Sequence, residues 1–245
     1  MLKNKVVVIT GAGGGLGREL VKAFIAKDAI VIGLGRNIMA LEQTKSAVNS
    51  QSFSVYEADI SNFNQLQKVV TEIVSQHERI DFLFNNAAVY PKINFLDETA
   101  ADFQQALNIN VCGIANCCKA VLPIMIKNKF GRVFNLGSWA DLGPIENSVV
   151  YSTSKGAVHA LTKAIAQDIA HYGVDIHVHE WIPGQLKTQM SGFMGIEPSL
   201  AASWAVAHAE STSDKQNCIF DEDAEWLPPK SFKEKIKSRL FFWEN

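Results

Sequence analysis

Short apolar segments alternate with longer amphipathic ones along most of this chain. The short segments have the composition of β-strands, and the longer ones repeat their apolar residues with the period of a helix. Strands that alternate with helices predict a parallel sheet, because parallel neighbours need a crossover connection rather than a tight turn. Most of the expected strands are continuously apolar, which is typical of strands covered on both faces. We therefore expect an α/β fold with about seven parallel strands and helices on both faces.

The alternation also sets the expected boundaries. The expected strands are Lys5–Thr10, Ile30–Leu34, Phe53–Glu57, Asp81–Asn85, Arg132–Leu136, Asp175–Trp181 and Cys218–Phe220. The expected helices are Leu16–Lys27, Met39–Asn49, Phe63–His77, Ala100–Lys127, Tyr151–Tyr172 and Pro198–Ala209. No internal repeat or low-complexity linker interrupts this order, so we expect a single domain over residues 1–220.

A charged and aromatic tail over residues 221–245 follows the last expected strand. Beyond Pro228 and Pro229, its apolar side chains share one face of a helix: Phe232, Ile236, Leu240 and Trp243. The tail is either a terminal helix packed on its own domain or an arm that covers the active site or a partner subunit.

Composition excludes several classes of protein. A net charge of −2 gives no basic excess to neutralise phosphates, so we expect no nucleic-acid partner. The chain shows no apolar run of about 18 residues and no secretory leader, and we expect a cytoplasmic protein without a membrane span. The four cysteines form no Cys-x-x-Cys pair, which is typical of reduced thiols. His177 and His179 would share one face of a strand, but no third ligand is apparent and we expect no metal site.

Five of the sixteen glycines stand between residues 11 and 17, after the first expected strand and at the start of the first expected helix. Backbone amides at the start of a helix bind anions, and glycines let a pyrophosphate approach the backbone. The pattern is Thr-Gly-x-x-x-Gly-x-Gly rather than the more common Gly-x-Gly-x-x-Gly. It predicts a Rossmann-type nucleotide-binding turn formed by Gly11, Gly15, Leu16 and Gly17.

This glycine spacing resembles that of the short-chain dehydrogenase/reductase family, and further motifs similar to that family's follow in order over about residues 1–220. Asp59 and Ile60 follow the third expected strand, where the family contacts the adenine. Asn86 and Ala87 lie in a segment similar to the family's Asn-Asn-Ala-Gly, with Ala88 as a departure. The segment after the sixth strand also matches, and the resemblance implies cofactor contacts at Pro183, Gly184, Leu186 and Thr188.

The resemblance also implies a catalytic group of Asn110, Ser138, Tyr151 and Lys155. Tyr151 and Lys155 are four residues apart at the start of an expected helix, so their side chains share a face. A free phenol has a pKa of about 10, and a nearby ammonium lowers it. We expect Tyr151 to exchange a proton with the substrate oxygen and Lys155 to tune its pKa.

The family's pattern implies further roles for these residues. Lys155 would also hold the nicotinamide ribose, Ser138 would hydrogen-bond the reacting oxygen, and Asn110 would hold a water that relays protons from Lys155 to solvent. Each residue also has an ordinary structural explanation: an aromatic at a helix start for Tyr151, a cap for Ser138 and a locally satisfied amide for Asn110.

Arg36 follows the second expected strand, where NAD-binding proteins commonly carry an acid for the adenosine ribose. The segment from Gly33 to Asn37 contains no acid, and an arginine can bind a 2′-phosphate through two hydrogen bonds. Arg36 could instead stack on the adenine of either cofactor. Many NADP-binding members of the family carry a second basic residue where this chain has Gly14. We expect NADP(H) in preference to NAD(H).

Three expected loops carry mostly apolar side chains beside the catalytic group: Val89–Ile93, Trp139–Ile145 and Gln185–Ile196. Their large residues are Tyr90, Trp139, Leu142, Ile145, Met190, Phe193 and Met194. Such walls favour a small apolar carbonyl or alcohol over a charged substrate, although the same residues could be core or subunit contacts. The family's lid after Thr188 is short here, which indicates an open site.

We therefore expect an NAD(P)-dependent oxidoreductase, a carbonyl reductase or alcohol dehydrogenase with a small-molecule substrate. A catalytically silent nucleotide-sensing regulator is the alternative, and degraded catalytic residues would favour it. An epimerase or dehydratase of the wider family usually has a longer C-terminal substrate domain. The resemblance implies a homodimer formed through the two longest helices. A homotetramer is less expected, because Cys218-Ile-Phe-Asp221 stands where the family's tetramers have Val-Asp-Gly-Gly.

Overall fold

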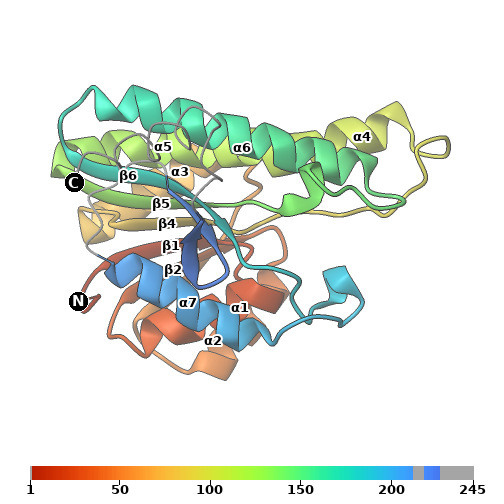
Figure 1. Cartoon of the computed structure of the whole chain (residues 1–245). Helices are drawn as coiled ribbons and strands as arrows, with labels where there is room; N and C mark the ends of the chain where they lie inside the picture. Colours follow the sequence, from red (N-terminus) through yellow and green to blue (C-terminus); the bar gives the residue numbers. More distant parts are fainter. Residues whose placement is uncertain (1, 212–217, 227–245) are drawn as a thin grey trace, which may run out of the picture.

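The computed structural model describes residues 2–211 and 218–226 of the chain (Figure 1). Its strands form one sheet in the order β3-β2-β1-β4-β5-β6-β7-β8. Their bounds are β1 (Val6–Thr10), β2 (Ile30–Gly35), β3 (Phe53–Glu57), β4 (Phe82–Asn85), β5 (Phe130–Leu136), β6 (Asp175–Ile182), β7 (Ile219–Asp221) and β8 (Ala224–Trp226). Neighbouring strands from β3 to β7 are parallel, and β8 is antiparallel to β7.

Helices cover both faces of this sheet. Their bounds are α1 (Gly15–Ile25), α2 (Ile38–Val48), α3 (Phe63–His77), α4 (Ala100–Leu107), α5 (Gly113–Asn128), α6 (Val149–Ala170) and α7 (Pro198–Glu210), with short turns η1 (Asn108–Cys112), η2 (Trp139–Asp141) and η3 (Gln189–Ser191). In Figure 1, α3, α5 and α6 lie on one face, and α1, α2 and α7 lie on the other. The predicted doubly wound Rossmann-type fold is therefore confirmed.

The central strand β1 shows why its sequence is apolar throughout. All five of its residues are buried. Val7 and Ile9 belong to the core under α1 and α7, whereas Val6 and Val8 belong to the core under α3 and α5. Because alternate residues of a strand point to opposite faces, burial on both faces requires a continuous apolar run.

The sheet extends past residue 220, where we expected the domain to end. Its eighth strand, β8, forms an antiparallel hairpin with β7 inside the segment that we assigned to the tail. The seven expected parallel strands are all present, and the described part of the chain adds an eighth, antiparallel strand that we did not predict. The proposed helical face from Phe232 to Trp243 lies outside the described residues.

The helix expected over Ala100–Lys127 is divided in the structure. A π-helical turn, η1, separates α4 from α5 and contains Asn110. Contrary to our reading of the sequence, the helical stretch Ala100–Asn128 is long and apolar enough to cross a membrane by length and composition. Half of its most apolar window is buried inside the protein, as in the core helix of an α/β domain.

Candidate active site

The glycine turn lies between β1 and α1. Gly11 and Gly15 have φ angles of 71° and 50°, a backbone region that favours glycine. A Cβ atom at Gly17 would overlap the carbonyl oxygen of Gly11. Helix α1 has no side-chain cap in the described structure and no acidic residue in its first turn, so its first N–H groups are left for an anion. These features fit a nucleotide pyrophosphate. The side chain of Leu16 is buried in the core.

The end of β4 supports this turn from behind. The Asn86 amide donates to the carbonyl oxygens of Thr10 (2.8 Å) and Gly11 (3.4 Å). The backbone N–H of Ala87 donates to Thr10 Oγ1 at 3.0 Å. On the outer side, a Cβ atom at Gly15 would lie 3.3 Å from Thr188 Cγ2. Asn86, Ala87 and Thr188 thus meet the glycine turn, as expected for residues around one nucleotide.

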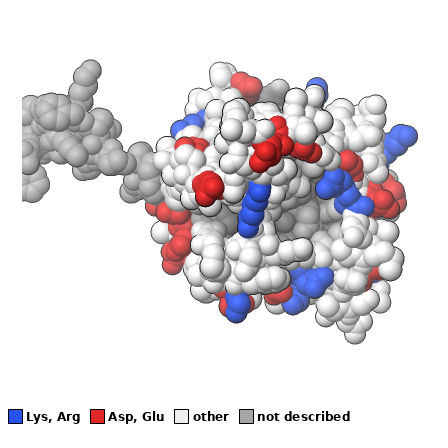
Figure 2. Space-filling view, turned by 90° about the vertical axis from the view of Figure 1, so that its right-hand side faces the viewer, with Lys and Arg blue, Asp and Glu red and all other residues white. Residues whose placement is uncertain are grey.

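A pocket of about 220 Å³ lies at the carboxyl ends of β2 and β3, and Arg36, Asp59 and Ser61 are among its lining residues. A second pocket of about 190 Å³ shares Arg36, Gln105 and Ile109 with it. Figure 2 shows the face formed by the carboxyl ends of the strands, which is hollowed near its centre and bordered by both basic and acidic side chains. Neither pocket is lined by the predicted catalytic residues. The first pocket lies on the expected adenosine side of the site, whereas the second is also lined by Val89 and Pro91 from the expected substrate wall.

The side chain of Asp59, which lines the first pocket, is held by hydrogen bonds to a nearby residue. Asp59 Oδ1 accepts from the backbone N–H and the hydroxyl of Ser61, at 2.9 and 2.7 Å. The next residue, Ile60, is buried, and its carbonyl oxygen accepts from the Asn116 amide. Arg36 is exposed and forms no ion pair within residues 2–211 and 218–226. Its guanidinium is accessible to a ligand.

Tyr151 and Lys155 lie in the first turns of α6, as predicted. Lys155 is 3% exposed; its Nζ donates to the carbonyl oxygen of Leu136 at 2.7 Å and lies 5.5 Å from the centre of the Tyr151 ring. Burial lowers the pKa of Lys155 to about 8, and the charge of Glu180 partly opposes this shift. Lys155 is thus a cation that can release a proton close to neutral pH.

The pKa of Tyr151 differs from our expectation. Burial raises it, a hydrogen bond with Ser138 lowers it, and the neighbouring Tyr90 raises it further. The net shift of the Tyr151 pKa is upward, because burial is the largest of these effects. Tyr151 is therefore a protonated phenol at neutral pH, which suits a proton donor. The Ser138 oxygen also accepts from the backbone N–H of Ala140 at 3.1 Å.

Asn110 ties a loop to α6. Its Oδ1 accepts from the backbone N–H of Val89 (2.8 Å), and its Nδ2 donates to Val89 O (2.9 Å) and Ser154 Oγ (3.0 Å). Asn110 is fully buried, and both amide hydrogens are used by these contacts. Its side chain fixes the loop after β4 against α6, and the expected role of holding a water remains a prediction.

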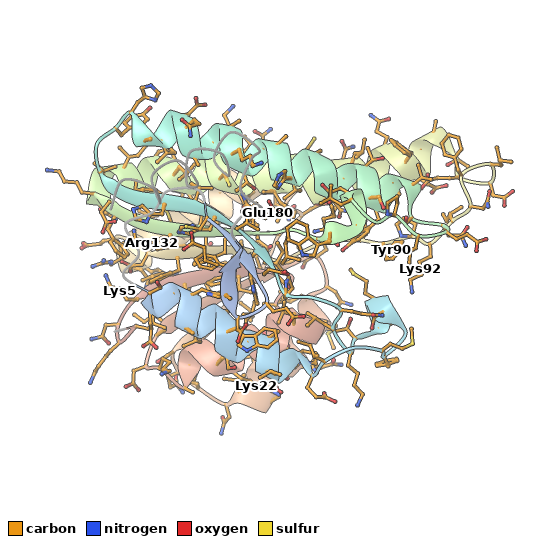
Figure 3. The ribbon with its side chains drawn as sticks, viewed as in Figure 1. Lys5, Lys22, Tyr90, Lys92, Arg132 and Glu180 are labelled. Atoms are coloured by element: carbon orange, nitrogen blue, oxygen red, sulfur yellow. The ribbon has the colours of Figure 1, made fainter. Side chains whose placement is uncertain are left out.

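The loop after β4 brings Tyr90 onto Tyr151. The two rings stack with centroids 4.5 Å apart and planes 19° apart. Lys92 Nζ lies 5.4 Å from the centre of the Tyr90 ring, and Figure 3 shows both side chains at the carboxyl end of the sheet. Sequence placed Tyr90 in the substrate wall but gave no signal for this stacking.

The other expected substrate walls are open to solvent. Leu142, Ile145, Phe193 and Met194 are each more than 60% exposed, and Met190 is 39% exposed. These side chains are therefore not part of the core. Trp139 Nε1 donates to Asp221 Oδ1 at 3.0 Å, which fixes this wall to β7.

The segment after β6 is a compact turn. Gly184 has a φ of 76°, directly after the buried Pro183. Leu186 forms a β-bridge with Ile196, and its side chain packs against the core. The chain between Leu186 and Ile196 folds back on itself. This agrees with the open site that we expected from the short segment after Thr188.

A family model described as "short chain dehydrogenase" matches residues 5–196 of the chain. The chain belongs to the short-chain dehydrogenase family. The meso-2,3-butanediol dehydrogenase of Serratia marcescens is 32% identical over 188 residues, which are 77% of this chain and 74% of that protein. The 3-oxoacyl-[acyl-carrier-protein] reductase of Synechocystis sp. is 27% identical over 202 residues, or 81% of each chain. The crystal structure of levodione reductase superposes with a TM-score of 0.83 at 25% identity, covering 90% of this chain and 96% of that one.

These matches confirm that this short-chain dehydrogenase is an NAD(P)-dependent oxidoreductase. Its four free cysteines include three that are buried, with Cys112 exposed. His177 and His179 do share a face of β6, with ring centroids 5.8 Å apart. In the described part of the dehydrogenase, no group of three or more His, Cys, Asp or Glu side chains could hold a metal ion.

Sequence reasoning missed an ionisable pair between α6 and β6 of this dehydrogenase. Glu180 on β6 is 2% exposed, and its Oε2 lies 2.6 Å from Nδ1 of His159 on α6. Two signals were present: Glu180 is an acid inside an apolar strand, and His159 follows Lys155 by four residues, one helical turn. Neither residue belongs to a motif that we used.

Proposed function

We propose that this short-chain dehydrogenase interconverts small, apolar carbonyl compounds and the matching alcohols, with Tyr151 as the residue that exchanges a proton with the substrate oxygen. NAD(P)(H) supplies or accepts the hydride when bound. The observation that carries the proposal is a half-buried, protonated phenol that is hydrogen-bonded to Ser138 and lies beside Lys155. Geometry and protonation state thus suit general acid catalysis.

Each side chain has a distinct part in this proposal. Tyr151 donates its proton to the oxygen of the carbonyl substrate. The hydrogen bond from Ser138 stabilises the phenolate that remains, which is why it lowers the pKa of Tyr151. Lys155 stays mostly protonated below its pKa of about 8 and supplies positive charge near the phenolate. Asn110 holds the loop that carries Tyr90 in place.

We propose that the nucleotide binds across the carboxyl ends of the strands, with each of its parts in contact with a different group of the residues described above. Gly11, Gly15 and Gly17, with the backbone of Leu16, would hold the pyrophosphate. Asp59 and Ile60 would contact the adenine, Asn86 and Ala87 would support the turn, and Pro183, Gly184, Leu186 and Thr188 would enclose the nicotinamide, together with Tyr151 and Lys155. The fit rests on the glycine turn, which leaves no room for a side chain at residue 17.

An assay of cofactor oxidation over a panel of carbonyl compounds tests this function. The panel includes the ketones of 2,3-butanediol, levodione and a 3-oxoacyl thioester, because relatives are named for such substrates. Aryl ketones and a charged sugar phosphate complete it. We expect turnover with at least one apolar member and none with the sugar phosphate. Tight nucleotide binding without turnover on any member would favour the alternative, a nucleotide-sensing regulator.

NADP(H) is the proposed cofactor, and Arg36 is the residue that would select it. Arg36 is exposed beside the Asp59 pocket, and β2 ends without an acid that would repel a 2′-phosphate. Arg36→Ala should raise the KM for NADPH about tenfold or more and change the KM for NADH little, because a charge-assisted hydrogen bond contributes about 1.5–3 kcal/mol. Lys45→Ala, an equal charge change at an exposed site on α2 outside the pocket, is the control. Equal effects of R36A on both cofactors would refute the assignment.

We also propose a cytoplasmic homodimer. The helical stretch Ala100–Asn128 and α6 are the surfaces we assign to the dimer, and half of the apolar window in the former is left unburied in the single chain. Light scattering of the full chain and of a form truncated at Pro228 would show a dimer in both cases if the tail has no part in assembly. A monomer or a tetramer would contradict the proposal.

A further inference from the structure

One face of the Tyr151 ring is covered by a second aromatic ring, that of Tyr90. The ring centroids lie 4.5 Å apart and the two planes are 19° from parallel, so the rings are stacked. A stacked aromatic pair stabilises a contact beyond the apolar area that it buries. Tyr90 comes from the loop after β4 and Tyr151 from the first turn of α6, so the contact forms only in the folded chain. The proposed proton donor is thus held on one side by a ring from another element.

The backbone next to Tyr90 is fixed to the backbone of Tyr151 by hydrogen bonds. The side chain of Asn110 binds both the N–H and the carbonyl oxygen of Val89, at 2.8 and 2.9 Å. Asn110 Nδ2 also donates to Ser154 Oγ at 3.0 Å, and that hydroxyl donates to the carbonyl oxygen of Tyr151 at 2.7 Å. Asn110 and Ser154 are both fully buried, which protects these bonds from water. The two rings are therefore stacked by residues whose backbones are also tied together.

The residues that follow Tyr90 restrict it further. Pro91 disfavours the helical region for the residue before it, so it limits the backbone of Tyr90. Lys92 Nζ lies over the Tyr90 ring, 5.4 Å from its centre, and Lys155 Nζ lies over the Tyr151 ring at 5.5 Å. An ammonium group is attracted to the face of an aromatic ring. Figure 3 shows Tyr90 and Lys92 together at the carboxyl end of the sheet.

We propose that Tyr90 is a positioning residue for Tyr151: its ring holds the phenol in the orientation that reaches Ser138 and the substrate oxygen. The proposal rests on the proposed function, in which Tyr151 donates the proton. A tyrosine side chain rotates about two bonds, and a small rotation moves its hydroxyl away from the reacting oxygen. Stacking removes this freedom before the substrate binds, and a misplacement of about 1 Å can cost about a hundredfold in rate. The flat ring of Tyr90 supplies this effect, and its hydroxyl is not required.

Three substitutions of Tyr90 separate stacking from the filling of space. Tyr90→Ala removes the ring, Tyr90→Leu fills part of the space without a flat ring, and Tyr90→Phe keeps the ring. We expect Y90A and Y90L to lower kcat for carbonyl reduction about tenfold or more, because the phenol loses its orientation. Y90F should recover most of that loss. The affinity for NADPH should change little in all three, because no part of the nucleotide is assigned to Tyr90.

Tyr172→Ala is the matched control for these variants. Tyr172 is 58% exposed just after the end of α6, so its removal deletes a tyrosine that lies outside the candidate site. Its kcat should equal that of the wild-type chain. A loss in Y172A as large as that in Y90A would contradict the proposal, because removal of any tyrosine side chain would then have the same effect.

A second experiment needs neither substrate nor nucleotide. The absorbance of tyrosinate is followed as a function of pH, and the step that disappears when Tyr151→Phe is added to each chain belongs to Tyr151. Burial raises the pKa of Tyr151, and the neighbouring Tyr90 raises it further; the other groups that face the phenol are Ser138 and Lys155. In Y90A the phenol is more exposed and the second tyrosine is gone, so its pKa should fall toward the ordinary value of 10.0. Y90F keeps the burial and should show a smaller fall.

The outcomes decide between stacking and simple packing. A lower kcat in Y90A and Y90L, recovery in Y90F and a lowered pKa of Tyr151 in Y90A support the proposal. A kcat of Y90L equal to that of wild type, equal losses in Y90A and Y90F, or an unshifted pKa in Y90A overturns it. If the wild-type chain reduces no carbonyl compound, the proposed function fails, and the titration still decides whether Tyr90 acts on Tyr151. Circular dichroism shows whether Y90A folds, and Y90L decides the proposal if it does not.

Discussion

The turn between β1 and α1 depends on glycines, whose lack of a side chain leaves room for the backbone and a ligand. The contact between α6 and β6 depends instead on ionisable side chains that are buried. The first region is shaped by Gly11, Gly15 and Gly17, and the Arg18 guanidinium donates to the carbonyl oxygen of Gly13 at 2.9 Å in the same turn. Guanidinium groups are always protonated in proteins. The second contains Lys155 and Glu180, both at most 3% exposed. Substitutions should therefore act by overlap and independently of pH in the first region, and through charge and pH in the second.

The largest effect is expected in the glycine turn. Gly17→Ala places a Cβ atom on the carbonyl oxygen of Gly11 and close to the Asn86 amide. The turn must shift, which should cost about 1–3 kcal/mol of unfolding free energy and lower the affinity for NADPH at least about tenfold. Fluorescence titration of NADPH and urea unfolding measure the two effects, and both should be the same at pH 6 and pH 9.

Gly14→Ala is the matched control for this substitution. Gly14 has an extended backbone with φ of −174°, and a Cβ atom there would meet nothing within 4 Å. Its affinity for NADPH should be close to that of the wild-type chain. Equal losses in G14A and G17A, or a loss in G17A that depends on pH, would show that the steric account of this turn is wrong.

A smaller effect, on the unfolding free energy, is expected from His179. This buried side chain lies on the face of β6 opposite to Glu180, away from the candidate site. His179 packs against Phe134 and Phe220, and burial lowers its pKa to about 3. The folded chain then resists a proton that the unfolded chain accepts below about pH 6.5. Unfolding free energy should therefore fall as the pH drops below 6.5, by about 1 kcal/mol at pH 5.5 from this group alone.

Urea unfolding of His179→Gln at pH 8 and pH 5.5 tests this statement. The variant should be less stable at pH 8, because the aromatic packing is lost, and should lose less stability between the two pH values. His208, whose pKa is also lowered by burial, contributes to the loss in both proteins. If H179Q and wild type lose the same amount, burial of His179 does not control the acid response.

The sequence predicted most of the fold because its strands are short, apolar and regularly spaced. Phe53–Glu57 and Phe63–His77 have the predicted bounds. It did not predict β8, whose three residues Ala-Glu-Trp carry no strand pattern and are set by pairing with β7. The π-helical turn at Asn108–Cys112 was also missed, because a π-turn preserves the apolar character of the helix around it.

The sequence likewise predicted some residues of the candidate site and missed others. Tyr151, Lys155 and Ser138 could be named from the family resemblance, and the four-residue spacing of Tyr151 and Lys155 predicted that they share one face of α6. The pair of Glu180 and His159 could not, because its members are on different elements and meet only in the folded chain. The direction of the Tyr151 pKa shift was wrong at first because it depends on burial, which spacing does not report.

The central claim is that the Tyr151 hydroxyl exchanges the proton with the substrate and is not required for nucleotide binding. A single-turnover experiment with Tyr151→Phe tests it most directly: the fluorescence of bound NADPH is followed after addition of a carbonyl compound that the wild-type chain reduces. The account predicts that both proteins bind NADPH with similar affinity, that the wild-type signal decays, and that the Y151F signal stays constant. Decay of the Y151F signal at the wild-type rate would contradict it.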